Sequence, residues 1–176
     1  AYLYFLMKTA FNGVWQAKVG TDAFNTPCGL MRHKESIYDK DNVLSWSAAL
    51  QNATILDGDF KQTLEHACDN SLVYLDPPYR GGFADYNTKK DDAFQETVIE
   101  FFENCKNKGS YCLLSNRALG DDFFAARKGA NKLVYFDVTY TVGRKKKNKD
   151  GEYEATKARE ILMVGHKGLC NLSMNT

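Results

Sequence analysis

The feature of this sequence that most constrains its fold is a strand, a helix and a second strand in succession, beginning at Leu72. The apolar run Leu72–Leu75 stops at Asp76, as a buried parallel strand does at the edge of a sheet. Residues 93–106 carry apolar side chains at helical spacing, and a second apolar run, Tyr111–Leu114, predicts another buried strand. The apolar positions of the expected helix are Phe94, Val98, Phe101, Phe102 and Cys105. This alternation predicts an α/β fold.

The C-terminal third of the sequence predicts antiparallel strands beside this pattern. Residues 133–142 are rich in β-branched and aromatic side chains, and residues 160–166 form a similar run. A basic segment with a turn signal joins the two runs, so we expect them to pair as a hairpin at an antiparallel edge of the sheet. A short helix is expected over residues 121–127.

The first part of the sequence differs from the rest because turn signals crowd together in it. These signals are Phe11-Asn12-Gly13, Gly20-Thr21-Asp22 and Asn25-Thr26-Pro27. Only residues 42–52 predict a helix there, and residues 55–60 are typical of a strand that ends in an acidic turn. We therefore expect a loop-rich and helical segment over residues 1–54 and the α/β sheet over residues 55–176.

Length and composition exclude several classes of protein. A chain of 176 residues can bury one good core, and it contains no apolar run near the roughly 18 residues that a membrane span needs. Its five cysteines include no Cys-x-x-Cys pair, so neither a zinc site nor a disulfide framework is predicted, and we expect a cytoplasmic protein. The formal net charge of +1 leaves a nucleic-acid partner open, because a basic binding face can be local.

The strongest chemical signal is the tetrapeptide Asp76-Pro77-Pro78-Tyr79, which follows the first predicted strand. Open α/β sheets bind ligands just outside the carboxyl ends of their strands. Two prolines fix the backbone and remove two N–H donors, which leaves carbonyl acceptors in set directions. The Asp76 carboxylate adds an acceptor, and Tyr79 adds an aromatic face.

Such a set of acceptors is suited to holding a planar exocyclic amine such as adenine N6. Acceptors that bond both amine hydrogens draw the nitrogen towards tetrahedral geometry and localise its lone pair for attack on a methyl sulfonium. Tyr79 would stack on the base, which must first be flipped out of a duplex. The alternative is a rigid Pro-Pro turn without a chemical role, and the rarity of the full tetrapeptide behind an apolar strand favours function.

These motifs resemble the DNA adenine methylase (Dam) family, of the D12 class of N6-adenine-specific DNA methyltransferases, over nearly the whole chain. Phe11-Asn12-Gly13 and residues 24–29 are similar to the recognition pattern of that family. Asp59-Phe60, Leu113-Leu114-Ser115-Asn116 and the stretch from Tyr140 to Leu162 follow in the family's order. The resemblance implies part of a Rossmann-like methyltransferase sheet and a DNA target-recognition segment.

The resemblance also implies roles in catalysis and in cofactor binding. Asp76, Pro77, Pro78 and Tyr79 would be catalytic, and S-adenosylmethionine would be the methyl donor, with no metal. Asp59 and Phe60 would line the pocket for the adenine of the cofactor, and Asp76 would also lie near its methionine part.

Double-stranded DNA is the partner that the resemblance implies. Phe11 and Asn12 would act at the flipped base pair, with Phe11 wedged into the base stack. Pro27 belongs to the same recognition pattern. A Phe in the core beside an Asn-Gly turn is an equally weighted alternative for Phe11 and Asn12.

Arg144–Lys149 holds five cations in six residues and precedes a turn, so phosphate contact is one interpretation, through Arg144 and Lys145 among others. A solvated loop is the other interpretation.

Two departures from the family pattern change what we expect. The family's glycine-rich loop, which cradles the methionine of the cofactor, has no counterpart here, so we expect a C-terminal portion of a longer enzyme that alone binds S-adenosylmethionine weakly or not at all. Gln16 stands where the family commonly has an arginine that reads guanine, and the spacing after it is longer by one residue. The target sequence is therefore expected to differ from the usual one.

The sequence thus predicts a DNA adenine-N6 methyltransferase, bacterial or phage-encoded, in a restriction-modification system, a phage or a chromosomal marking pathway. An amino-methyltransferase that acts on RNA, protein glutamine or cytosine N4 is a related alternative. A non-catalytic DNA-binding fragment is an alternative from another class.

Overall fold

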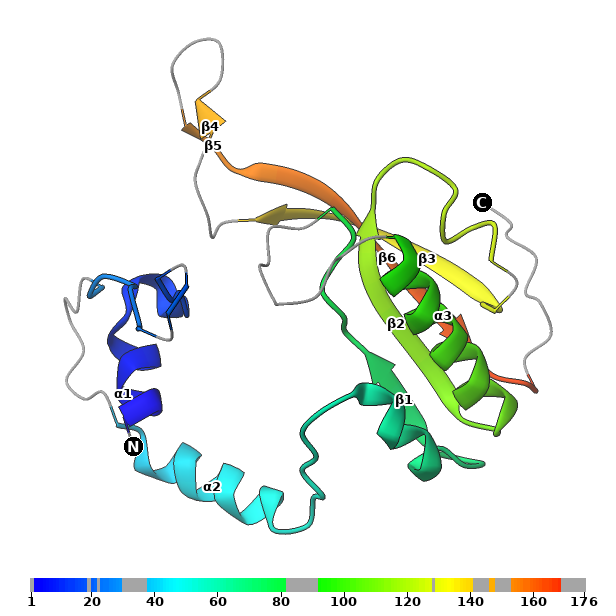
Figure 1. Ribbon diagram of the computed structural model, residues 1–176, viewed down its shortest axis with the longest axis horizontal. Helices are drawn as coiled ribbons and strands as arrows, with labels where there is room; N and C mark the ends of the chain where they lie inside the picture. The colour runs from blue at the N-terminus through cyan, green and yellow to red at the C-terminus, as the bar shows by residue number, and fades with distance from the viewer. Residues whose placement is uncertain are drawn as a thin grey trace. The chain divides into compact units, whose positions relative to one another are not determined.

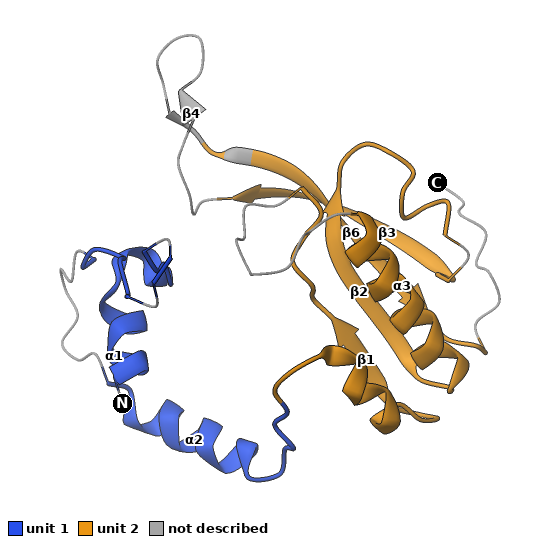
Figure 2. Ribbon diagram, viewed as in Figure 1, with its two compact units in different colours: residues 1–56 blue, residues 57–176 orange. Residues whose placement is uncertain are grey.

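The structure is a computed structural model that describes residues 2–18, 20–21, 23–29, 38–81, 92–127, 129–140, 146–147 and 153–168. The chain divides into two compact units, residues 1–56 and residues 57–176, which we call unit 1 and unit 2 (Figure 2). Each unit is described by itself.

Unit 1 is made of short helices and turns. Its elements are α1 (Tyr2–Thr9), the 3₁₀ turn η1 (Phe11–Gly13) and α2 (Lys40–Leu50). Asp39 caps α2, because its carboxylate accepts a hydrogen bond from the Asn42 N–H at 3.0 Å. Among the described residues of this unit only Ala10 is a buried apolar residue, so unit 1 has little core of its own.

Unit 2 is built on a four-stranded mixed sheet with the strand order β1-β2-β6-β3 (Figure 1). Its strands are β1 (Leu72–Leu75), β2 (Tyr111–Ala118), β3 (Lys132–Tyr140) and β6 (Thr156–Gly165). β1 and β2 run parallel, with Leu75 opposite Leu114, whereas β6 runs antiparallel to both β2 and β3. A separate two-residue ladder joins β4 (Lys146–Lys147) to β5 (Tyr153–Glu154).

The core of unit 2 lies on one face of this sheet, under the helix α3 (Asp92–Asn107). Phe102 of α3 is fully buried against the sheet residues Leu114 and Met163, and α3 lies along β2 (Figure 1). The 3₁₀ helix η2 (Phe60–His66) adds Phe60 and Leu64 to the margin of this core. On the opposite face several large side chains are exposed, which are Leu72, Tyr74, Tyr111 and Phe136.

Most elements expected from periodicity are present. β1 has the predicted bounds, α3 covers residues 93–106, and α2 covers most of residues 42–52. β3 pairs with β6 as the predicted antiparallel hairpin, over most of the expected ranges. The mixed α/β class with an antiparallel part is therefore confirmed.

Four expectations were wrong. Residues 55–59 form no strand, since Ile55 is exposed and pairs with no neighbouring strand in the described part of the chain. Residues 121–127 make a single turn rather than a helix, because Phe123 and Phe124 of this segment pack against the core. The helix α1 was not predicted, because residues 2–7 form an unbroken apolar run rather than an alternation of apolar and polar positions. β1 is not fully buried, because it is an edge strand with one open face.

The second strand is longer than expected. β2 continues past Asn116 to Ala118 because β6 remains paired with it as far as Arg159.

The cysteines and helices of the described residues add two findings. Cys28, Cys68, Cys105 and Cys112 are free thiols, and burial raises the pKa of Cys112 to about 12, so this thiol stays protonated and unreactive. No helix within the described ranges has the length and apolar character to cross a bilayer.

Phe102→Ala should lower the free energy of unfolding by about 3–5 kcal/mol, because it leaves a cavity between α3 and the sheet. The matched control is Phe136→Ala on β3, because this residue is already 46% exposed. Denaturant unfolding measures both variants, and we expect the control to lose less than half as much. Equal losses would show that α3 does not organise this core.

Candidate active site

The tetrapeptide Asp76-Pro77-Pro78-Tyr79 leaves β1 at its carboxyl end, beside the parallel strand β2. Asp76 is exposed, and the other three residues are half-buried. Parallel pairing sets the end of β1 against Ser115 and Asn116 of β2. Functional groups from two strands therefore meet at one edge of the sheet.

The Asp76 carboxylate is oriented by a chain of hydroxyl groups. The Ser115 hydroxyl donates to Asp76 Oδ1 at 2.9 Å, and the Tyr74 hydroxyl donates to Ser115 Oγ at 3.1 Å. Asp76 Oδ2 has no hydrogen-bond partner among the described residues. One carboxylate oxygen is thus held in place while the other remains available as an acceptor.

The two proline carbonyls differ in what they contact. The Gln95 side-chain N–H donates to the Pro78 carbonyl at 2.9 Å, so this carbonyl is turned towards the protein. The Pro77 carbonyl accepts no hydrogen bond from the residues that the structure describes. Of the acceptors expected from the sequence, the Pro78 carbonyl is therefore already occupied, and Asp76 Oδ2 and the Pro77 carbonyl remain.

Tyr79 lies half-buried at the end of the tetrapeptide. Burial raises the pKa of its phenol, and the nearby Asp76 carboxylate raises it further, while the Ser115 hydroxyl acts in the opposite direction. The phenol is therefore uncharged at neutral pH.

Arg80 anchors the end of the tetrapeptide and was not predicted from the sequence. Its backbone N–H donates to Asn116 Oδ1 at 2.9 Å, and its guanidinium pairs with Asp92 at 2.6 Å and with Asp121. The guanidinium also lies 4.2 Å from the centre of the Phe123 ring. The hydrogen bonds from Arg80 lower the pKa of both carboxyl groups.

Gln95 and Asn116 were also missed, although the sequence carries a signal for each. Gln95 occupies an apolar position of α3, one turn before Val98, and Asn116 continues the buried alternation of Cys112 and Leu114 in β2. A polar residue at a core position of a periodic pattern is the observation that could have identified both.

Asp59 and Phe60 lie in unit 2, at the start of η2. Asp59 caps that helix, since its Oδ1 accepts from the Lys61 N–H at 2.9 Å. The Phe60 ring packs edge-on against Phe101, with 5.1 Å between ring centres. The Phe60 ring therefore packs mainly against the core.

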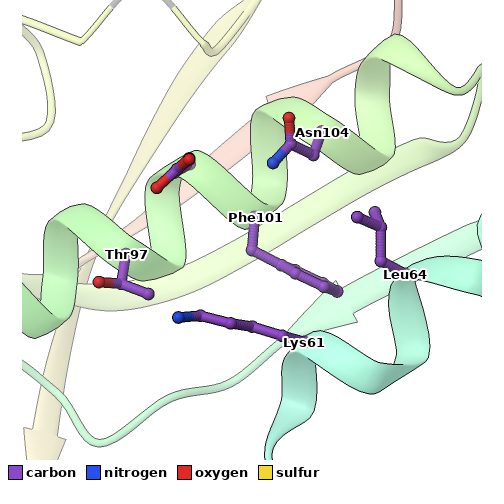
Figure 3. A pocket seen from close by; sticks show the side chains of 6 residues that line it. Lys61, Leu64, Thr97, Phe101 and Asn104 are labelled. Carbon is purple, nitrogen blue, oxygen red and sulfur yellow. The ribbon is translucent and has the colours of Figure 1, made fainter.

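A shallow pocket of about 180 Å³ lies between η2 and α3. Figure 3 shows Lys61 and Leu64 of η2 facing Thr97, Phe101 and Asn104 of α3 across it. The pocket is smaller than the roughly 300 Å³ at which most ligand sites begin, and neither Asp59 nor Phe60 lines it. It does not by itself form a cofactor site.

The candidate DNA-contacting residues of unit 1 are exposed. Phe11 is 51% exposed, which argues against its placement in a core, and its N–H donates to the Pro27 carbonyl at 2.9 Å. Asn12 adopts a left-handed backbone conformation with φ of 53°. The Gln16 side chain is exposed, while its carbonyl accepts from the Asn25 N–H. The backbone hydrogen bond of Phe11 therefore places it next to Pro27.

Arg144 and Lys145 lie outside the described residues, so the basic run is represented only by the backbone pairing of Lys146–Lys147. Within the described ranges, no group of three or more His, Cys, Asp or Glu side chains could hold a metal ion.

The sequence is similar to proteins that methylate DNA. Residues 1–122 match the D12 class N6 adenine-specific DNA methyltransferase family. The type II methyltransferase M.MjaIII of Methanocaldococcus jannaschii is 34% identical over 163 residues, which are 88% of this chain and 55% of that protein. This chain therefore spans about half the length of that relative.

Two further relatives match shorter stretches. The retron Ec67 DNA adenine methylase of Escherichia coli is 30% identical over 82 residues, which are 44% of this chain and 28% of that protein. The DNA adenine methylase of Haemophilus influenzae is 32% identical over 75 residues, which are 43% of this chain and 25% of that protein.

Arg80→Met should destabilise unit 2 at pH 7, and the loss relative to the parent should shrink in acid. Because the folded-state pKa values of Asp92 and Asp121 are lowered, their pairing stabilises the fold above about pH 4 and is lost as pH falls through the lowered values. Denaturant unfolding at pH 7 and pH 3 measures the difference.

The matched control is Arg159→Met, because Arg159 also pairs with a carboxylate, Asp137, and lies over a ring, Tyr135, but is 61% exposed. An exposed pair contributes little, so this control should change stability less at both pH values. If Arg80→Met loses the same stability at pH 7 and pH 3, the carboxylates of Asp92 and Asp121 do not hold the Arg80 guanidinium.

Proposed function

Because this chain belongs to the D12 class N6 adenine-specific DNA methyltransferase family, we propose that it transfers a methyl group to the N6 amine of a flipped adenine in double-stranded DNA. The single observation that carries this proposal is the pair of acceptors left open at the end of β1, Asp76 Oδ2 and the Pro77 carbonyl. We propose that the sheet of unit 2 is part of a Rossmann-like methyltransferase sheet.

The acceptors act on the amine before transfer. N6 carries two hydrogens and a lone pair delocalised into the ring, so it is a poor nucleophile. Hydrogen bonds from N6 to Asp76 and to the Pro77 carbonyl pull the nitrogen out of conjugation, and Tyr79 stacks on the extruded base. When bound, S-adenosylmethionine would supply an electrophilic methyl group, and its sulfur would keep the electron pair of the broken S–C bond. The Asp76 carboxylate would be placed to take the proton that N6 sheds.

The start of η2 offers groups that fit the adenine of S-adenosylmethionine. Capping of the helix occupies Asp59 Oδ1 and leaves Oδ2 free to accept from an exocyclic amine. The Phe60 N–H donates to no other described residue, so it can donate to a ring nitrogen. Asp59 and the backbone of Phe60 would therefore hold the cofactor's adenine, with Asp76 near its methionine part.

We assign target recognition to unit 1 and phosphate contact to the basic run that includes Arg144 and Lys145. The exposure of Phe11 supports insertion into the base stack, and the adjacent Asn12, Gln16 and Pro27 would contact the same DNA segment. A non-catalytic DNA-binding role is the second candidate, which the same exposed residues support. A methyl-transfer assay on DNA against RNA, together with a DNA-binding titration, separates these functions.

Asp76→Ala should reduce kcat for DNA methylation by about 10²–10³-fold, because one preorganised polar contact to the amine is lost. The measurement is steady-state methyl transfer by the complete protein with an adenine-containing duplex. Asp137→Ala, at a 91% exposed aspartate of β3, is the control and should leave turnover unchanged. A kcat of Asp76→Ala close to that of the parent would contradict a catalytic role for Asp76.

Gln16→Arg should change sequence preference at one flanking position. An arginine donates two hydrogen bonds to guanine, whereas a glutamine amide donates one and accepts one, which matches adenine. A bidentate contact discriminates by about 1–3 kcal/mol, so relative rates should change by roughly tenfold or more.

The measurement for Gln16→Arg compares methylation rates on duplexes varied at each flanking position, for the parent and the variant. Gln51→Arg, in the turn that follows α2, controls for the added charge. Identical preferences in parent and Gln16→Arg would show that Gln16 does not read a base.

A further inference from the structure

We propose that Gln95 and Asn116 form a buried amide clamp that holds the catalytic turn, residues 76–80, in the conformation that leaves the Pro77 carbonyl free. They are positioning residues rather than catalytic residues, since neither reaches the groups that would touch the base. The expected effect of the clamp on kcat rests on the proposed function. Its effect on the conformation of the turn rests on the hydrogen bonds alone.

The clamp binds the turn at two points on either side of Tyr79. Gln95 donates to the Pro78 carbonyl at 2.9 Å, and Asn116 Oδ1 accepts from the Arg80 N–H at 2.9 Å. Asn116 Nδ2 donates to Gln95 Oε1 at 2.9 Å, which joins the two halves. Asn116 Oδ1 also accepts from the N–H of Arg117. The two amides are thereby each fixed in a single orientation.

The burial of this pair indicates that the turn requires it. Gln95 is 1% exposed and Asn116 is 0% exposed, within the apolar core between α3 and β2. Buried amides are costly unless they are hydrogen-bonded, and an apolar pair would fill the same positions without that cost. The turn, however, contains two prolines without N–H donors, so it has few donors of its own, and side chains from outside satisfy the Pro78 carbonyl and the Arg80 N–H.

The clamp therefore decides which proline carbonyl is available. With the Pro78 carbonyl held by Gln95 and the Arg80 N–H held by Asn116, the Pro77 carbonyl is left without a hydrogen bond from the described residues. Loss of the clamp would let the turn shift, and a displacement of about 1 Å at a reacting group can cost on the order of 10²-fold in rate.

Gln95→Glu tests the donor specifically, because the introduced carboxyl group has nearly the same shape. When ionised it cannot donate to the Pro78 carbonyl, and when protonated it can. The ratio of variant to parent kcat should therefore fall as pH rises, towards about 10⁻² at the alkaline end, while KM for DNA changes little. Gln95→Met, which can never donate, should lower kcat at every pH without this slope.

The ionisable side chains around the clamp are common to parent and variant, so the ratio cancels their effect. They are Asp76, Tyr79, Arg80, Asp92, Glu96, Asp121 and Arg127. The matched control is Gln51→Glu, because the Gln51 amide also donates to a backbone carbonyl, that of Ser47, but on the surface. The ratio of its kcat to the parent kcat should be independent of pH.

Hydrogen exchange of the Arg80 N–H tests the clamp without methyl transfer. In Gln95→Glu and Gln95→Met this amide should exchange at least tenfold faster than in the parent, while the amide of Leu114 in the core stays protected. A flat pH ratio with unchanged Arg80 exchange would overturn the clamp. Failure of the parent to methylate DNA would refute the proposed function instead, and the exchange measurement would still decide the clamp.

Discussion

The parallel pairing of β1 with β2 positions the groups that meet at the carboxyl end of β1. With Leu75 opposite Leu114, the residue that follows β1, Asp76, comes beside Ser115, and the turn beyond it comes within reach of Asn116. A slip of one residue would move Ser115 and Asn116 to the opposite faces of the sheet and remove both contacts at once. The packing of α3 on one face secures this register, since Leu114 is fully buried beneath it.

Two kinds of contact hold the turn, and they differ in environment. The ion pairs of Arg80 with Asp92 and Asp121 lie near the surface, where solvent and salt weaken them. The amide contacts of Gln95 and Asn116 lie in the core, where water does not compete and an unmade bond is costly. The ion pairs of Arg80 therefore hold the end of the turn in place, and the amide hydrogen bonds of Gln95 and Asn116 determine its conformation.

Sequence patterns predicted the parts of this molecule in which side-chain periodicity and burial coincide. α3 and the β3–β6 hairpin are of this kind, and the family resemblance drawn from the motifs is confirmed by the match over residues 1–122. α1 and residues 55–59 were misjudged because neither segment has a buried residue, so burial and side-chain pattern do not coincide there. Gln95 and Asn116 stand out in the sequence as polar residues at core positions, but their partners could not be predicted, because these are tertiary contacts to a turn distant in sequence.

The clamp on the turn carries no formal charge, and this has a consequence for how the protein responds to ionic conditions. Contacts to DNA phosphates weaken steeply with added salt, because bound counterions must be displaced. Neutral hydrogen bonds in a dry core are not screened in this way. Under the proposed function, ionic strength would therefore set how long the protein stays bound to DNA, while the conformation of the turn would stay constant.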